Sequence, residues 1–193
     1  KILRARVYDV AEETPLERAK NLSKKFKNHI WLKREDLQPV FSFKLRGAFN
    51  RMSQLSKNEL SKGVIASSAG NHAQGVALSA SFLKCRAVIV MPLTTPIMKV
   101  KAVESHKAEV ILFGETYDEC YEKALEISQK ENLTFIHPFD DPEVIAGQGT
   151  IGLEILRQSH KPPDAIYIAV GGGGLIAGVS AYVKAIWPDT KII

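Results

Sequence analysis

Short apolar runs alternate with longer runs of helical period along most of the chain. From residue 63 onward, the short runs predict strands, and the longer runs, in which apolar positions recur every three or four residues, predict helices. The predicted strands span residues 63–67, 87–91, 109–113, 134–137 and 165–170. The predicted helices span residues 72–83, 98–106, 117–131, 142–159 and 175–186. This alternation predicts an α/β fold with a mostly parallel sheet covered by helices.

The part of the chain before residue 63 has a less regular pattern. Pro15 suits the first turn of a helix, so we expect a helix over residues 15–26. Its apolar side would comprise Leu16, Ala19, Leu22 and Phe26. A strand is expected over residues 30–34, and a further helix runs through Lys44 to near Leu55. Because residues 191–193 resemble the opening of a strand without its helix, we expect the chain to be cut inside a domain.

Composition narrows the class of protein. The chain has 193 residues, of which 45% are hydrophobic and 24% charged, and it contains no apolar stretch long enough to cross a bilayer. The formal charge of +5 raises the question of nucleic acid, but the basic run Lys20 to Lys27 lacks interleaved aromatic residues and fits a solvated helix face. The composition therefore predicts a globular protein with neither a nucleic-acid nor a membrane partner.

The cysteines, histidines and acidic pairs predict no special chemistry. Cys85 and Cys120 are too few for a disulfide framework, and we expect reduced thiols in a cytoplasmic protein, or in an organelle stroma if a leader has been removed. The five histidines lack ligand spacing, so no metal site is expected. The acidic pair Asp140 and Asp141, next to Pro142, is expected to cap the following helix. Two acidic residues, Glu35 and Asp36, are expected to pair locally with Lys33 and Arg34.

Four consecutive glycines give the clearest chemical signal. Gly171, Gly172, Gly173 and Gly174 follow the predicted strand 165–170 and open the helix that begins near Leu175. Glycines between a strand and a helix allow backbone N–H groups to converge on an anion, which the helix N-terminus also favours. The run matches neither GxGxxG nor a GxxxxGK[ST] loop, so a simple phosphate ester is favoured over a dinucleotide or a nucleoside triphosphate.

Two further segments are candidates for chemistry. Lys44 lies between Phe43 and Leu45, and desolvation by such neighbours favours the neutral amine, which is a nucleophile towards a carbonyl cofactor. The run Ser67 to His72 joins a predicted strand to a predicted helix. Its backbone N–H groups and the Asn71 amide could hold a carboxylate or phenolic oxygen, or Ser68 and Asn71 could simply cap the helix.

Together these segments resemble the fold-type II pyridoxal-phosphate enzymes, and among them the biosynthetic threonine dehydratases. The resemblance covers nearly the whole chain. It rests on VYDVAEETPL (7–16), KREDLQPVFSFKLRGAF (33–49), SSAGNHAQGV (67–76), FDDPEVIAGQGTIGLE (139–154) and GGGGLIAG (171–178). It implies pyridoxal 5′-phosphate as cofactor, an amino acid as substrate and a homo-oligomer, as a dimer or tetramer. The expected reaction converts threonine, and serine, to a 2-oxo acid and ammonia at the entry to isoleucine synthesis.

The resemblance also implies roles for individual residues. Lys44 would carry the cofactor as a Schiff base and then remove the substrate's α-proton, and Phe43 would pack on the cofactor ring. Asn71 would hydrogen-bond the ring's phenolic oxygen. The phosphate would be held by Gly171, Gly172, Gly173, Gly174 and Leu175. The substrate carboxylate would be bound by Ser68, Gly70, Asn71 and His72.

The family also implies a division of the chain. Residues 1–62 and 141–193 would belong to a large cofactor domain, and residues 63–140 to a small mobile domain that closes over the substrate. The partner of the pyridine nitrogen would lie beyond residue 193.

Other enzymes of the same fold remain alternatives: serine dehydratase or racemase, threonine synthase and cysteine synthase. Leu45 after the lysine, where both synthases usually carry an acidic residue, favours a dehydratase or a serine racemase. A more distant alternative is a non-catalytic phosphate-binding module, for which the glycine turn alone would suffice.

Overall fold

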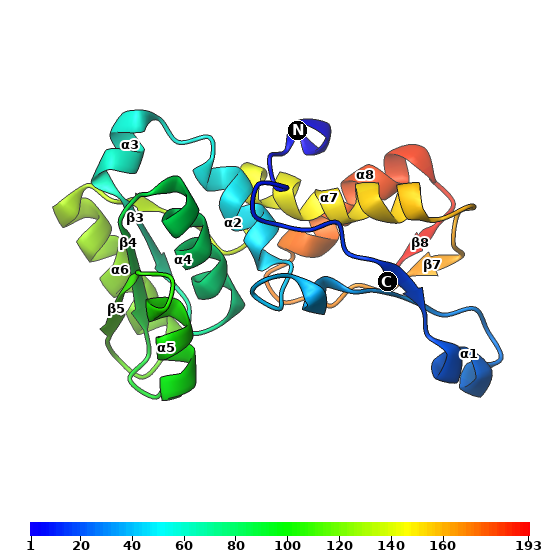
Figure 1. Ribbon diagram of the computed structural model, residues 1–193, viewed down its shortest axis with the longest axis horizontal. Helices are drawn as coiled ribbons and strands as arrows, with labels where there is room; N and C mark the ends of the chain where they lie inside the picture. The colour runs from blue at the N-terminus through cyan, green and yellow to red at the C-terminus, as the bar shows by residue number, and fades with distance from the viewer.

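The computed structural model describes residues 1–193 and is an elongated molecule with a sheet-based part and a helical part (Figure 1). The sheet has four parallel strands in the order β5-β4-β3-β6. These strands are β3 (Val64–Ser67), β4 (Ala87–Met91), β5 (Glu109–Leu112) and β6 (Thr134–Phe135). The predicted α/β fold with a parallel sheet is therefore confirmed, although the predicted strand 134–137 is shorter.

Helices cover both faces of this sheet, and every residue of its central strands β3 and β4 is buried. Side chains alternate between the faces of a strand, so Ala66 and Ile89 enter one core while Ile65 and Val88 enter the other. The first core is completed by α4 and α5, and the second by α6. These helices are α4 (Asn71–Leu83), α5 (Ile97–Glu104) and α6 (Tyr117–Glu131).

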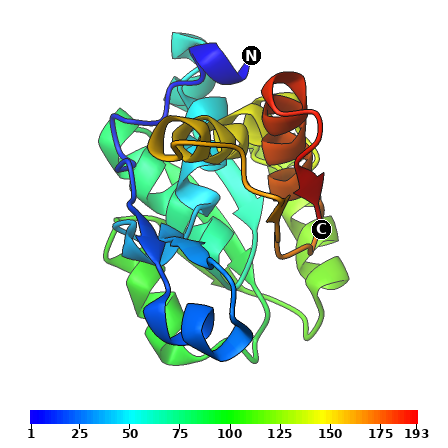
Figure 2. The same ribbon diagram turned by 90° about the vertical axis from the view of Figure 1, so that its right-hand side faces the viewer.

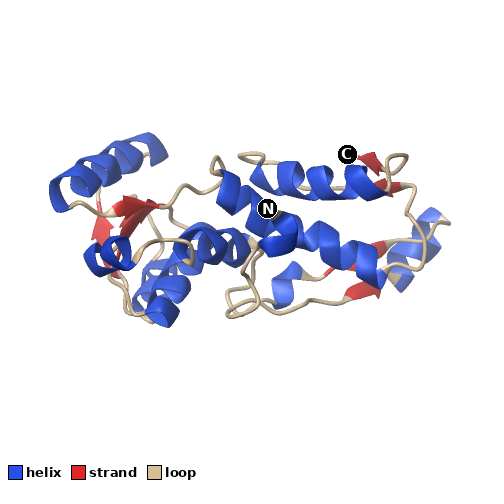
Figure 3. Cartoon of the chain, turned by 90° about the horizontal axis from the view of Figure 1, so that it is seen from above, coloured by secondary structure: helices blue, strands red, loops and turns tan.

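The other half of the molecule is built on three packed helices and a short strand pair (Figure 3). The elements are α2 (Lys44–Met52), α7 (Pro142–Gln158), α8 (Gly174–Ile186), β7 (Ala165–Ile166) and β8 (Lys191–Ile192). Glycines let the helix backbones approach closely: a Cβ added to Gly147 in α7 would lie 2.6 Å from the Arg46 carbonyl oxygen in α2. Asp141 caps α7 as predicted, because its carboxylate accepts N–H groups of Glu143 and Val144. The predicted strand 165–170 ends at residue 166.

The predicted helix over residues 15–26 is wrong in its first part. Residues Leu16–Arg18 form strand β1, which pairs antiparallel with β2 (Trp31–Lys33), and helix α1 covers only Lys20–Phe26. Figure 2 shows α1 beyond this strand pair. The expected apolar side is also wrong, because Leu22 is 41% and Phe26 60% exposed. Pairing with β2 satisfies the backbone of residues 16–18 and overrides the helix-start signal of Pro15.

Three short elements were not expected from the sequence. They are helix α3 (Lys57–Lys62) and the 3₁₀ turns η1 (Ile2–Arg4) and η2 (Glu35–Leu37). A capping box explains α3: Ser56 accepts the Glu59 N–H, and the Glu59 carboxylate accepts the Ser56 N–H. No helix is long and apolar enough to cross a membrane.

Candidate active site

A strained turn precedes Lys44, which is the first residue of α2. Phe41 has φ = 56°, in the left-handed region that costs a bulky residue about 1 kcal/mol or more. The turn is closed by Phe41 N–H, which donates to the Gln38 carbonyl at 2.7 Å. The hydroxyl of the next residue, Ser42, accepts the Lys44 N–H at 3.3 Å. The backbone direction of Lys44 is therefore fixed before the helix begins.

The Lys44 amine is half-buried and has no carboxylate partner. Nζ donates to the Pro138 carbonyl oxygen at 2.7 Å and lies 5.6 Å from the centre of the Phe43 ring. Burial lowers the pKa of this amine because the ammonium loses hydration without gaining a counter-charge. A larger fraction of Lys44 is thus in the neutral, nucleophilic form than for an exposed lysine.

The segment between β3 and α4 leaves a helix N-terminus without a side-chain cap. Gly70 is the N-cap residue, and neither Ser68 nor Asn71 caps the helix. The Ser68 hydroxyl instead accepts the Gly70 N–H at 3.2 Å, and Asn71 is exposed in the first helical turn. The capping alternative for these two residues is therefore wrong. An uncapped N-terminus retains free N–H groups that suit a carboxylate.

Two buried polar atoms near this turn have no hydrogen-bond partner, namely Ser67 Oγ and His72 Nδ1. The Nε2 atom of His72 lies 2.9 Å from the Ile136 carbonyl oxygen, which can only accept, so Nε2 carries the proton. Burial lowers the pKa of His72 to about 4, and nearby Lys44 contributes in the same direction. His72 is therefore a neutral side chain at physiological pH, with an unused acceptor nitrogen.

The glycine run forms an open cradle on one side and a tight contact on the other. The N–H groups of Gly171, Gly172 and Gly173 donate no hydrogen bond within the protein. A Cβ on Gly171 or Gly173 would meet nothing within 4 Å, whereas one on Gly172 would lie 2.2 Å from the Phe139 ring. Gly173 also has φ = 86°, which favours glycine. Free backbone donors therefore lie at the start of α8, as a phosphate site would require.

Residues 136–139 connect the three predicted motifs. The carbonyl of Ile136 binds His72, the carbonyl of Pro138 binds Lys44, and the Phe139 ring packs on Gly172. The amino-acid sequence does not reveal this segment, because two of its contributions are backbone carbonyls, which every residue type has. Its place after β6, at the carboxyl edge of a parallel sheet, is the signal that could have indicated it.

Two further predicted residues share one apolar cluster. Phe43 and Leu175 both pack against the buried group formed by Ile151, Ile155, Val179 and Val183. Helix α4 also approaches the lysine: a Cβ on Gly75 would lie 3.2 Å from the Lys44 carbonyl carbon. The structure thus brings Phe43, Lys44, the His72 turn and the glycine run to one region.

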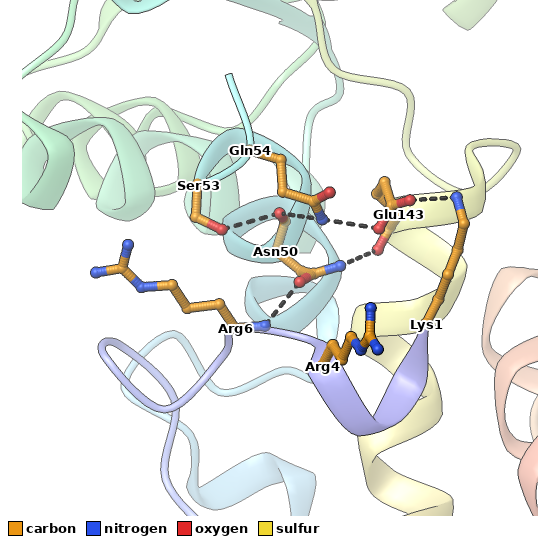
Figure 4. A pocket seen from close by; sticks show the side chains of 7 residues that line it. All are labelled: Lys1, Arg4, Arg6, Asn50, Ser53, Gln54 and Glu143. Atoms are coloured by element: carbon orange, nitrogen blue, oxygen red, sulfur yellow. Dashed lines mark hydrogen bonds and ion pairs between the residues drawn. The ribbon is translucent and has the colours of Figure 1, made fainter. Parts of the chain in front are cut away.

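A separate hollow of about 370 Å³ is lined by none of the residues of these motifs (Figure 4). Its lining is entirely polar or charged: Lys1, Arg4, Arg6, Asn50, Ser53, Gln54 and Glu143. Asn50 joins its walls by accepting the Arg6 N–H and donating to the Glu143 carbonyl. No group of three or more His, Cys, Asp or Glu side chains in the protein could hold a metal ion.

A family model described as "Pyridoxal-phosphate dependent enzyme" matches residues 7–193. The chain belongs to this family. It is 62% identical to the biosynthetic, chloroplastic threonine dehydratase of Arabidopsis thaliana and 59% identical to a biosynthetic L-threonine dehydratase of Burkholderia multivorans. Both alignments cover 100% of this chain, but only 32% and 39% of the relatives' lengths. The chain therefore spans about a third of the curated relatives that it matches.

Solved structures of the family share the fold. Threonine deaminase isoform 2 from Solanum lycopersicum superposes with a TM-score of 0.96 at 58% identity, over 99% of this chain and 52% of that one. Maize serine racemase superposes with a TM-score of 0.95 at 33% identity, over 99% and 58% of the two chains. The expected fold-type II architecture is confirmed, as is the resemblance to threonine dehydratases.

Proposed function

We propose that the protein containing this chain is a pyridoxal-phosphate-dependent threonine dehydratase that converts L-threonine to 2-oxobutanoate and ammonia, the first step of isoleucine biosynthesis. L-Serine would give pyruvate by the same route. The observation that carries the proposal is the Lys44 amine, which is half-buried, unpaired and directed at the segment that also contacts the glycine turn. The similarity to biosynthetic threonine dehydratases supports the choice of substrate.

The residues present fit the cofactor. A phosphate ester needs convergent donors, and three glycine N–H groups before α8 are free. An aldehyde needs a neutral amine, and burial lowers the pKa of Lys44. When bound, pyridoxal phosphate supplies a carbonyl that condenses with amines and a ring that takes up an electron pair from the substrate.

Each residue then has a defined task. Lys44 would hold the cofactor through Nζ, and its amine would take the proton from the substrate α-carbon. Phe43 would pack on the cofactor ring, and the Asn71 amide would donate to the ring's phenolic oxygen. The phosphate would be bound by Gly171, Gly172, Gly173, Gly174 and Leu175. The substrate carboxylate would be bound by Ser68, Gly70, Asn71 and His72, chiefly through N–H groups of the α4 N-terminus.

His72 contributes no charge to the binding of an anionic ligand at this turn. Because its pKa is about 4 and its Nε2 proton is bound to Ile136, it adds no positive charge at neutral pH. Attraction of the carboxylate therefore rests on oriented backbone dipoles, which need no reorganisation when the substrate arrives. Residues 63–140 would form the small mobile domain, and its closure over the substrate would exclude water while the α-proton is removed.

The experiment is an assay of the intact protein with pyridoxal phosphate and L-threonine. We expect equimolar 2-oxobutanoate and ammonia from the parent and none from Lys44→Ala. Lys62→Ala is the matched control, since Lys62 is exposed at the end of α3, and it should retain full activity. Absence of 2-oxobutanoate from the parent would refute the proposal.

Serine racemase is the second candidate, supported by the superposition with the maize enzyme. It predicts D-serine from L-serine without 2-oxobutanoate from threonine, which the same assay resolves by chiral chromatography. We further propose a homo-oligomer, a dimer or tetramer. The compartment would be the cytoplasm or an organelle, because the relatives include bacterial, chloroplastic and mitochondrial proteins.

A further inference from the structure

Four charged side chains form a buried network around Arg46, two residues after Lys44 in α2. They come from β2, η2, α2 and α7, and their side chains are almost inaccessible to water. The network consists of Lys33 (9% exposed), Glu35 (13%), Arg46 (0%) and Glu154 (0%). Two cations and two carboxylates balance, so no net charge is buried.

Two carboxylates bind Arg46, one along each of two edges of the guanidinium group that share Nη2. Its Nε and Nη2 atoms donate to Glu35 at 2.8 Å each, and its Nη1 and Nη2 atoms donate to the two oxygens of Glu154. Thr150 Oγ1 and the Glu12 carbonyl oxygen, both at 3.1 Å, accept further bonds from Nη1 and Nη2. A planar guanidinium with partners at all three nitrogens has one permitted orientation.

Glu154 extends the network towards the N-terminal segment. Lys33 Nζ lies 2.6 Å from Glu154 Oε2, and the Tyr8 hydroxyl donates to Oε1 at 2.8 Å. Burial and the adjacent Glu154 carboxylate raise the pKa of Tyr8 to about 12, so this hydroxyl stays a donor at physiological pH. The network therefore ties four separated parts of the chain to one residue of α2.

Stability alone is a poor explanation for such a network. Replacing buried ion pairs by apolar residues of similar size is often neutral or stabilising, because desolvation offsets the attraction. Charged partners fix the rotation of a helix about its own axis, whereas apolar packing tolerates several rotations. The helix whose rotation is fixed here is α2, and its first residue is Lys44.

The spacing of the two residues makes the network effective. Residues two apart on a helix differ by roughly 200° in direction, so they project from opposite sides. The Arg46 side chain binds partners on the side of α2 that faces α7 and η2. The Lys44 side chain extends from the other side of the helix towards the Pro138 carbonyl. Any rotation of α2 would break the Arg46 bonds and displace the amine.

We propose that the Lys33–Glu35–Arg46–Glu154 network is a positioning device that fixes the rotation of α2 and thereby places the Lys44 amine for bond formation with the cofactor carbonyl. The four residues touch neither the glycine cradle nor the α4 turn, so they are positioning residues. The inference rests on the proposed function, in which Lys44 is the residue that binds the cofactor covalently.

The test compares two ligands of the same cradle on the intact apoprotein. Pyridoxal phosphate needs the Lys44 amine for its covalent bond, whereas pyridoxamine phosphate has no carbonyl and binds without it. We expect Glu154→Gln, which preserves shape but removes a charge, to weaken binding of pyridoxal phosphate by about tenfold or more relative to pyridoxamine phosphate. Glu35→Gln, at a less buried position, serves if the first variant does not fold. The control Glu109→Gln disrupts the exposed ion pair with Arg86 and should leave the ratio unchanged.

The outcomes separate the two claims. If both affinities stay unchanged or fall by the same factor, the network is merely structural and the positioning role is refuted. If the parent protein itself forms no imine absorbance band with pyridoxal phosphate, the proposed function fails. A selective loss for pyridoxal phosphate in the network variants, beside a normal parent, supports the positioning role.

Discussion

The contact between α2 and α7 predicts that Gly147→Ala is destabilising even though alanine is the better helix former. The new Cβ would lie 2.6 Å from the Arg46 carbonyl oxygen and 2.7 Å from the Gly47 Cα. Both atoms belong to backbone, and ordinary contacts need about 3.5 Å, so the two helices must separate. Overpacking of this kind costs about 1–3 kcal/mol, and the helix-propensity gain of about 1 kcal/mol offsets part of it. Because the new contacts are this short, we take the overpacking cost at about 3 kcal/mol, so the variant should lose about 2 kcal/mol of unfolding free energy in total.

Urea unfolding of the intact protein, followed by far-UV circular dichroism, measures this loss as a shift of the midpoint. Gly152→Ala is the matched control on the same helix, because its Cβ would meet nothing closer than 3.3 Å. We expect its stability to stay within about 1 kcal/mol of the parent. A Gly147→Ala variant as stable as Gly152→Ala would refute the close approach of α2 and α7. Because α2 begins with Lys44, the Gly147→Ala variant should also bind pyridoxal phosphate more weakly.

Two further predictions concern single side chains. Asp141→Ala should destabilise the protein by about 1 kcal/mol, and Asp141→Asn by less, because Asp141 caps α7 through the N–H groups of Glu143 and Val144. Equal urea midpoints for the parent and Asp141→Ala would contradict this cap. His72 should titrate near its pKa of about 4 in an NMR experiment. Because this pKa is below the unfolded value of 6.5, the folded state binds fewer protons between them, and stability should fall by about 3 kcal/mol as pH decreases through that window. A titration near 6.5 would show that His72 is not buried as a neutral side chain.

The sheet was predictable because its strands combine local pattern and burial. Strands β3 and β4 are short apolar runs that end at turn residues, and both faces of each strand are covered. The β1 strand was not predictable, because its existence depends on pairing with β2, thirteen or more residues later, while the local Pro15 signal favours a helix. Tertiary pairing decided the structure there.

The candidate site was predictable where side-chain type carries the chemistry. Lys44, the turn around Asn71 and the glycine run stand out as residue patterns, and the structure brings the lysine, His72 and the glycines to one segment. Their individual roles stay predictions. The Pro138 carbonyl could not be predicted, since every residue has one.

The buried network was also beyond the sequence pattern. Arg34 and Asp36 do pair locally, as expected, but Glu35 turns inward to Arg46 and Lys33 to Glu154. Local pairing was therefore wrong for Lys33 and Glu35. Arg46 and Glu154 are 108 positions apart, and no spacing rule relates them.

The central claim is that Lys44 is the residue that binds pyridoxal phosphate covalently. The most direct test is borohydride reduction of the intact protein with the cofactor, followed by peptide mass spectrometry, since reduction makes the imine permanent. We predict one phosphopyridoxyl group, on the peptide that contains Lys44, and no labelled peptide from Lys44→Ala. Labelling of a different lysine in the parent, or no labelling at all, would contradict the account.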